Sequence, residues 1–339
     1  MWVTSCPLHR RAFLKRALIT GITGQDGSYL AELLLGLEYD VHGTIRTTTN
    51  DPADTRIGHL VKGDIPSVTL HVTDLGDSHS LMRLVEDLHP DEVYNLAAQS
   101  HVRASFDQPV HTGSVTGLGA VRILEAIRRV DPTIRYYQAS SSEMFGSAPP
   151  PQNEATPFHS RSPYAVAKVY AYWATVNHRE AYGLHASNGI LFNHESPRRG
   201  KEFVTRKITA SIPLLVKGEL TRLKLGNLEA RRDWGHARDY VRAMHLMLQL
   251  PEPVDLVVGT GESHSVRDFL DVAFGFVGLD WHNYVETDAR HFRPAEVDSL
   301  QSDPSRAREV IGWTATISFE ELVEDMVRTD MKAYGLDPN

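Results

Sequence analysis

The amino-acid sequence predicts an α/β protein with a doubly wound parallel sheet and a smaller, interleaved α/β region. Two observations predict this fold. From Lys15 onward, short apolar runs alternate with amphipathic stretches, and a glycine-rich turn separates the first apolar run from the first amphipathic stretch. Such alternation is typical of repeated β-α units, whose strands lie parallel. At roughly 150 residues per domain, the length of 339 residues is sufficient for both regions.

Six apolar runs are expected to form the first strands of the sheet. They lie at residues 17–20, 40–44, 68–72, 92–96, 135–139 and 186–191. Between them, apolar residues recur at three- and four-residue spacing, which predicts amphipathic helices. These helices are expected over residues 28–37, 79–88, 110–129 and 164–182.

The regular alternation ends after residue 191. Residues 193–201 are rich in Pro, Arg and Gly, and after them we expect a helix over 205–217, a strand over 222–225 and a helix over 239–250. The apolar run 256–258 predicts a return to the first sheet. The expected organisation is therefore an extension over 1–14, a first domain over 15–191, and a region over 192–339 of which about 236–262 returns to the sheet.

Composition excludes several classes of protein. The 35 Lys and Arg residues are outnumbered by 43 Asp and Glu residues, so the formal net charge of −8 gives no general attraction to nucleic acid or anionic lipid. No apolar run approaches the roughly 20 residues of a membrane span, and the first residues have their charges after the apolar ones, the reverse of a signal peptide. The single cysteine, Cys6, suits a reducing compartment and predicts a cytoplasmic protein. The 17 histidines are scattered without ligand-like spacing, so no metal is expected.

A glycine-rich turn follows the first expected strand and leads directly into the first helix. Glycines three residues apart let the backbone turn sharply and approach a pyrophosphate, which the helix N-terminus would face. A plain tight turn is the alternative, and the position between strand and helix argues against it. The candidate cofactor-binding residues of this turn are Gly21, Thr23, Gly24, Gln25, Asp26 and Gly27.

The end of the second expected strand indicates which dinucleotide would bind. NAD-specific sites usually place an acid there for the ribose 2′-hydroxyl, whereas this chain has Arg46 and no acid. A guanidinium suits a 2′-phosphate, so the sequence favours NADP over NAD. A solvated surface arginine is the alternative.

Tyr164 and Lys168 stand four residues apart at the start of an expected helix, which places phenol and ammonium on one helical face. The lysine cation is expected to lower the pKa of the phenol, so that the tyrosine can act as a base toward a sugar hydroxyl during hydride transfer. By itself this spacing is common and usually marks a surface pair. The glycine turn and the serines at 140–142 favour the catalytic interpretation.

The glycine turn, the serine cluster and the Tyr-x-x-x-Lys pattern together resemble the extended short-chain dehydrogenases/reductases that act on nucleotide sugars. Six longer stretches resemble one family among them, the GDP-mannose 4,6-dehydratases, at residues 138–143, 162–168, 188–200, 204–207, 232–236 and 292–297. The resemblance covers about residues 15–334. It implies a Rossmann domain over 15–191 that binds NADP and a second region that mainly binds the nucleotide sugar.

The resemblance also implies a reaction. Tyr164 removes the proton of the sugar 4-hydroxyl while the C4 hydride passes to bound NADP⁺, and Lys168 holds the nicotinamide ribose. Glu143 then takes the acidified C5 proton and assists loss of the 6-hydroxyl as water. Return of the hydride to C6 gives GDP-4-dehydro-6-deoxy-D-mannose. Ser141 stands where the family usually has a catalytic Thr, so the hydroxyl is kept and a methyl group is absent.

Further site residues follow from the same resemblance. Cofactor contacts are implied for Asp74, Leu75, Leu96, Ala97, Ala98, Ser100, His111, Lys168, His194 and Arg199. Nucleotide-sugar contacts are implied for Ser100, Ser141, Glu143, Tyr164, Asn193, Arg198, Val204, Lys207, Arg232, Arg293 and Glu296. Arginine and lysine suit a diphosphate, and a carboxylate can accept hydrogen bonds from ribose or base. A solvated surface charge is the alternative for each charged member.

The resemblance implies a homodimer or homotetramer, built on a four-helix interface from the helices over 110–129 and 164–182. The second helix carries Ala171, Tyr172, Ala174 and Thr175, and its small alanine residues are expected to allow close approach. Two departures bear on the cofactor site: Thr47 replaces a second arginine that is common in the family, and His111 replaces a tyrosine. The absence of an arginine at Thr47 weakens both the prediction of NADP as cofactor and the prediction of a tetramer.

Two other functions remain open at this stage. One is another nucleotide-sugar dehydratase, epimerase or 4-keto reductase of the same fold. The other is a non-catalytic NADP-binding protein, against which the complete set of Ser141, Glu143, Tyr164 and Lys168 argues.

Overall fold

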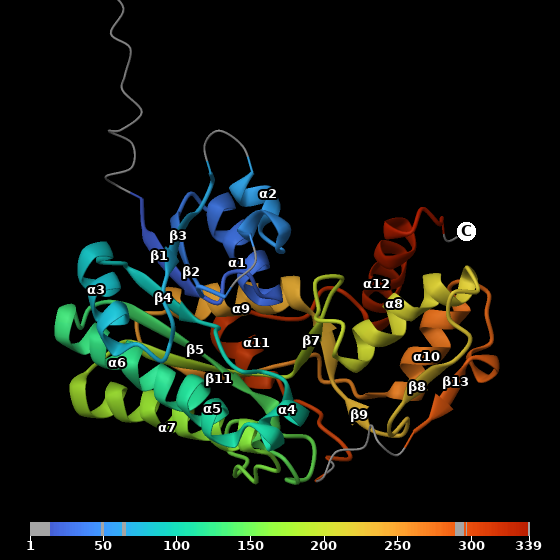
Figure 1. Ribbon diagram of the computed structural model, residues 1–339. Coiled ribbons are helices and arrows are strands. Elements are labelled where there is room, and N and C mark those ends of the chain that lie inside the picture. The colour runs from blue at the N-terminus through green and yellow to red at the C-terminus, as the bar shows by residue number, and fades with distance from the viewer. Residues whose placement is uncertain (1–13, 49–50, 63–65, 289–294, 296, 338–339) are drawn as a thin grey trace, which may run out of the picture.

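The computed structural model describes residues 14–48, 51–62, 66–288, 295 and 297–337. A seven-stranded sheet runs through the molecule (Figure 1), with the strand order β11-β6-β5-β4-β1-β2-β3. Its strands are β1 (Arg16–Thr20), β2 (Asp40–Ile45), β3 (Thr69–Val72), β4 (Glu92–Asn95), β5 (Arg135–Ser141), β6 (Ala186–Leu191) and β11 (Asp255–Val258). Every neighbouring pair is parallel. The predicted fold class is therefore confirmed, and the run at 256–258 does join the sheet, beside β6.

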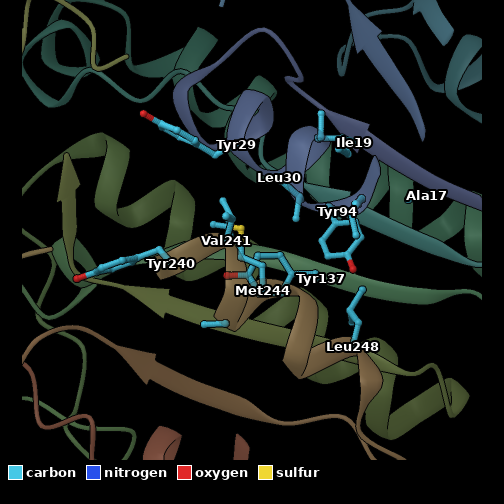
Figure 2. Close-up of a cluster of buried hydrophobic side chains, with 14 of the residues drawn as sticks. Ala17, Ile19, Tyr29, Leu30, Tyr94, Tyr137, Tyr240, Val241, Met244 and Leu248 are labelled. Atoms are coloured by element: carbon cyan, nitrogen blue, oxygen red, sulfur yellow. The ribbon is translucent and has the colours of Figure 1, made fainter. Parts of the chain in front are cut away.

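Helices cover both faces of the sheet because successive strand residues point to opposite sides. Ala17 and Ile19 of β1 belong to one buried cluster and Leu18 belongs to another. The first cluster, drawn in Figure 2, packs under α1 (Gln25–Gly36), α9 (Ala237–Gln249) and α11 (Ser305–Ile311). The second packs under α3 (Ser78–Leu88) and α6 (Gly119–Val130), with α7 (Pro163–Tyr182) beside them.

A second group of elements lies at the end of the molecule opposite α3 and α6 (Figure 1). Its helices α8 (Val204–Val216), α10 (Val266–Gly275) and α12 (Phe319–Ala333) share a buried apolar cluster. Three two-stranded sheets accompany them: β7 (Asn193–Glu195) with β10 (Trp234–His236), β8 (Leu223–Leu225) with β13 (Val285–Thr287), and β9 (Arg231–Arg232) with β12 (His264–Ser265). The boundaries expected between the two regions stay a prediction, and residues 1–13 of the expected extension lie outside the described residues.

The helix expected over 110–129 is confirmed as an unbroken helical run, but the run is not α-helical throughout. It consists of α5 (Pro109–Thr112), a π-helical segment Gly113–Leu118 and then α6, and a separate short helix α4 (Val102–Asp107) precedes it. Close packing accompanies the irregular segment. A Cβ atom at Gly117 would lie 3.2 Å from Cδ1 of Tyr170 on α7, and one at Gly119 would lie 3.0 Å from Cβ of Leu75.

Short helical segments complete the structure: α2 (Gly58–Val61) and the 3-10 turns Pro52–Asp54, Ser142–Met144 and Trp281–Asn283. None of the helices in the described part of the chain is both long and apolar enough to cross a membrane.

Two glycines of α1 give a matched test of how tightly this helix packs on its own entry turn. A Cβ atom at Gly27 would lie 2.4 Å from the carbonyl oxygen of Gly21 and 2.6 Å from Cα of Ile22, whereas one at Gly36 would meet nothing within 4 Å. We expect Gly27→Ala to lower the free energy of unfolding by about 1–3 kcal/mol or more, because backbone atoms must move. Gly36→Ala should raise it by up to about 1 kcal/mol. Urea titration measures both, and equal effects would contradict this packing.

Candidate active site

A cavity of about 400 Å³ opens where β1, β2, β4, β5 and β6 end. Every residue predicted to bind the cofactor lines it, from Gly21 in the first turn to Arg199 beyond β7. The predicted catalytic residues Ser141, Glu143, Tyr164 and Lys168 line the same cavity. Parallel strands place their carboxyl ends at one edge of a sheet, which is how segments so far apart in sequence meet here. The individual roles of these residues stay predictions.

The glycine turn forms one wall of the cavity. Gly21 follows β1 with a φ of +71°, and a Cβ atom there would lie 3.0 Å from Cα of Ala97 in the loop after β4. Glycine at this position therefore permits both the turn and the close approach. Gly24 caps α1 with extended backbone, and the first N–H groups of a helix lack intrahelical acceptors.

The glycine turn, the N-terminus of α1 and Arg46 together fit a dinucleotide. The helix N-terminus suits a pyrophosphate, and Arg46 lies exposed at the cavity where β2 ends. Two cavity-lining oxygens, Oγ1 of Thr73 and Oδ1 of Asn193, are buried without a hydrogen-bond partner among the described residues. Such atoms are available to a bound ligand.

A buried ion pair stands beside the glycine turn. Nε2 of His194 lies 2.8 Å from Oδ2 of Asp26, and Gln25 donates to the carbonyl oxygen of His194 at 3.1 Å. Burial opposes ionisation of Asp26, yet His194 holds the pKa of that carboxyl at about 2. Burial likewise opposes the charge on His194, and Asp26 raises its pKa. The pair therefore joins the start of α1 to β7.

The catalytic candidates come from two adjoining elements. Ser141 ends β5, and its Oγ accepts the N–H of Glu143 at 3.2 Å, capping the turn Ser142–Met144. Tyr164 and Lys168 lie in the first turns of α7, which begins with Ser162 as N-cap and a proline at its first position. Nζ of Lys168 lies 5.8 Å from the centre of the Tyr164 ring, so both side chains do share one helical face.

Electrostatics at this pair differ from the sequence-based expectation. Burial raises the pKa of the Tyr164 phenol to about 12, and its hydrogen bond with Ser141 offsets only part of that rise. Burial also lowers the pKa of Lys168 to about 8, while Nζ donates to the carbonyl oxygen of Ala139 at 2.5 Å. The expected lowering of the phenol pKa by lysine was wrong, because residue spacing contains no information on how deeply the two groups are buried.

The predicted substrate residues are only partly brought together. Ser100, Ser141, Glu143, Tyr164 and Asn193 line the cavity, whereas Arg198, Val204, Lys207 and Arg232 do not. Arg293 and Glu296 lie outside the described residues.

The three cations outside the cavity have protein partners. Arg198 donates to Oγ of Ser28 at 3.0 Å and to Oε1 of Glu32 at 2.6 Å, both on α1. Lys207 donates to the carbonyl oxygen of Lys224 at 2.6 Å, and Arg232 to that of Arg231 at 2.8 Å. Their contacts with substrate stay predictions.

Sequence reasoning missed part of the cavity wall. The missed residues at or just beyond strand ends are Thr44, Ile45, Thr73, Ala139, Ser140, Ser142, Leu191 and Phe192. The general rule that ligands bind at the carboxyl ends of parallel strands could have identified these positions. Val102, Val115 and Phe203 have no comparable local signal. Within the described ranges, no group of three or more His, Cys, Asp or Glu side chains is arranged to hold a metal ion.

Comparison with known proteins gives concordant matches. A family model described as GDP-mannose 4,6 dehydratase matches residues 18–326. GDP-mannose 4,6 dehydratase 2 of Arabidopsis thaliana is 58% identical over 326 residues, covering 94% of this chain and 87% of the relative. The enzyme of Cricetulus griseus with the same family name is 48% identical over 349 residues, covering 96% and 94%.

Among solved structures, a UDP-glucose 4-epimerase of Thermus thermophilus in complex with NAD superposes with a TM-score of 0.79. It is 25% identical in sequence, and the match covers 94% of this chain and 99% of that one.

Lys168 should destabilise the fold at neutral pH. Its folded-state pKa of about 8 lies below the ordinary 10.5, so the cost of burying the ammonium is fully present below pH 8 and fades by pH 10.5. The difference corresponds to roughly 3 kcal/mol, from which loss of the hydrogen bond to Ala139 subtracts about 1 kcal/mol. We expect Lys168→Met to have a larger free energy of unfolding than the unmodified protein at pH 7. The difference between the two proteins should be smaller at pH 10, and urea titration measures it at both pH values. The exposed Lys332→Met is the control, and a Lys168→Met protein less stable at pH 7 would contradict this account.

Proposed function

Because this chain belongs to the GDP-mannose 4,6 dehydratase family, we propose that it removes water from GDP-mannose to give GDP-4-dehydro-6-deoxy-D-mannose. The proposed enzyme is a hydro-lyase that uses NADP and acts in the cytoplasm. The observation that carries the proposal is that Glu143 shares one cavity with Ser141, Tyr164, Lys168 and the glycine turn. A carboxylate in that position supplies the base that dehydration needs in addition to hydride transfer.

Each catalytic residue has one proposed task. Bound NADP⁺ would supply a hydride acceptor for C4 and later the hydride for C6. A proton would return to C5 as the hydride reaches C6, which balances the proton taken from the 4-hydroxyl. Tyr164 accepts the proton of the 4-hydroxyl. Its hydrogen bond with Ser141 offsets part of the rise in phenol pKa that burial causes, which favours this role. Lys168 orients the nicotinamide ribose.

Oxidation at C4 makes the neighbouring C5–H acidic, and Glu143 removes that proton. The same carboxyl group then protonates the departing 6-hydroxyl, so the base is restored as water leaves. The short link from Ser141 Oγ to the Glu143 N–H holds the two residues in fixed relation during these steps.

The requirement for an elimination base separates this function from its rivals. A 4-epimerase oxidises and reduces its sugar at one carbon and needs no group to remove a C5 proton. A non-catalytic binding protein would need neither Tyr164 nor Glu143 in the cavity. The likeness to an epimerase structure concerns the fold, and the curated relatives matched over nearly the whole chain favour the dehydratase.

Glu143→Gln tests this function directly, because the amide keeps the size of the side chain and loses its basicity. We expect this variant, mixed with GDP-mannose and NADP⁺, to show a rise in the absorbance of reduced nicotinamide without release of dehydrated product. Tyr164→Phe should show neither the rise in absorbance nor the dehydrated product. Normal product formation by Glu143→Gln would exclude Glu143 as the elimination base.

The choice of NADP over NAD rests on Arg46. Its guanidinium lies at the end of β2, where a dinucleotide in this fold places the adenine ribose. Thr47, next in sequence, is exposed and offers no second positive charge. A single charged contact is therefore proposed to discriminate between the cofactors.

We expect Arg46→Ala to weaken NADP⁺ binding by about ten- to a hundredfold, which is the loss of one charge-assisted contact of roughly 1.5–3 kcal/mol. NAD⁺ binding should change little. Fluorescence titration measures both affinities, with Arg103→Ala on α4, outside the cavity, as the control. Equal weakening for the two cofactors would show that Arg46 is not the discriminating residue.

We also propose at least a homodimer. Apolar side chains are exposed on α5, the π-helical segment and α7: Val110, Leu118, Val166, Tyr170 and Trp173. Val110 is 84% exposed and Trp173 56%. The interface predicted from the sequence was partly wrong, because Ala171, Tyr172 and Thr175 are buried within the chain. Of the exposed set, Val166, Tyr170 and Trp173 lie on the other side of α7. Together with Val110 and Leu118 they suit a helical interface between two copies.

Trp173→Glu should shift the protein toward a monomer, because a carboxylate would be buried against apolar side chains. Light scattering at micromolar concentration should give the mass of at least two chains for the unmodified protein and a lower mass for the variant. Val216→Glu changes an exposed apolar residue on α8 and should leave the mass unchanged. A single-chain mass for the unmodified protein would exclude the dimer.

A further inference from the structure

A row of polar side chains crosses neighbouring strands of the sheet. Thr20, Asn95 and Gln138 are register partners on β1, β4 and β5, and the row continues to Asn188 on β6 and Asp255 on β11. Thr20, Asn95 and Gln138 are only 1–2% exposed. Strands of a parallel sheet covered on both faces are normally apolar, and a buried polar group costs free energy unless it is hydrogen-bonded.

One end of this row supports the cofactor side of the cavity. Oγ1 of Thr20 donates to Oδ1 of Asn95 at 2.8 Å. The same Oγ1 accepts the N–H groups of Leu96 and Ala97, each at 3.1 Å. Leu96 and Ala97 line the cavity, so the Thr20–Asn95 contact fixes the backbone of that wall.

The middle of the row leads toward Lys168, the candidate catalytic lysine. Oε1 of Gln138 accepts from Nδ2 of Asn95 at 2.9 Å and from the hydroxyl of Tyr136 at 2.5 Å. These two donors set the orientation of the Gln138 amide, so its NH₂ group must point the other way. Nε2 of Gln138 donates to the carbonyl oxygen of Ala139 at 3.0 Å, and that oxygen is also the acceptor for Nζ of Lys168.

We propose that Asn95 and Gln138 are positioning residues that direct Lys168 through the shared carbonyl of Ala139. A carbonyl oxygen has two lone pairs. When Gln138 occupies one of them, only the other is available to the flexible lysine, whose ammonium is thereby aimed along a single direction. The inference rests on the proposed role of Lys168 toward the cofactor, and it links that residue to the Leu96–Ala97 wall by an unbroken chain of hydrogen bonds.

Two variants and a control test this hydrogen-bonded chain from Asn95 through Gln138 to the carbonyl of Ala139, which we call the relay. Gln138→Met keeps the approximate length of the side chain and removes its amide, and Tyr136→Phe removes a single hydroxyl from the relay. Tyr137→Phe is the matched control, because Tyr137 is equally buried on the same strand and its hydroxyl has no partner among the described residues.

We expect Gln138→Met to lower kcat for GDP-mannose by about ten- to a hundredfold, as a misplaced catalytic group does, with KM unchanged within about twofold. Tyr136→Phe should lower kcat less, and Tyr137→Phe should not change it. A lower unfolding midpoint for Gln138→Met with an unchanged kcat would overturn the proposal, since that result assigns the row to stability alone. If Gln138→Met does not fold, Tyr136→Phe decides: a kcat equal to that of Tyr137→Phe overturns the proposal.

A second readout needs no turnover. Competitive acetylation of the cofactor-free protein, followed by mass spectrometry, reports how readily Lys168 reacts. Without the Gln138 amide, the Lys168 ammonium is no longer held in one direction. Lys168 should therefore be acetylated at least about threefold faster in Gln138→Met than in Tyr137→Phe. Equal acetylation rates of Lys168 in Gln138→Met and Tyr137→Phe would overturn the relay, whatever the substrate of the enzyme. If the rates differ but the unmodified protein is inactive on GDP-mannose, the relay stands and the proposed function is rejected.

Discussion

The carboxyl ends of parallel strands meet at one edge of the sheet, and the cavity depends on that geometric constraint. Gly21 after β1, Arg46 after β2, Ala97 after β4, Ser141 at the end of β5 and Asn193 after β6 come from widely separated parts of the sequence. The strands stay in register because apolar clusters lock both faces of the sheet, with alternate residues of each strand contributing to each cluster. Rigid strands thus hold loops whose side chains can differ in chemistry without altering the fold.

Within the cavity, burial has opposite consequences for two charged groups because their partners differ. Asp26 has an imidazole at 2.8 Å and retains its charge, with a pKa of about 2. Lys168 has a neutral carbonyl as its hydrogen-bond acceptor, and its pKa falls to about 8. A lysine held in this state sacrifices folding stability, which suits a group reserved for a ligand rather than for the fold.

The sequence-based predictions succeed where the signal is local and fail where it is long-range. Apolar runs, helical spacing and the glycine turn predict the sheet and the cofactor wall, because these features depend on neighbouring residues. The ion pair of Arg198 with Glu32 joins residues 166 positions apart, and no local pattern reveals that this arginine turns away from the cavity. The π-helical segment likewise packs closely on another helix at Gly117, where an added Cβ atom would lie 3.2 Å from Cδ1 of Tyr170. Burial of Tyr164, which reverses the expected direction of its pKa, is also a property of the assembled fold.

The central claim is that one cavity both removes and returns the same hydride while water is lost in between. GDP-mannose deuterated at C4 tests it most directly, by mass spectrometry and NMR of the product. The account predicts a product lighter by one water, with the deuterium at C6 and no net reduction of NADP⁺. Deuterium recovered in free NADPH, or a product that retains its 6-hydroxyl, would contradict the account and indicate an ordinary dehydrogenase.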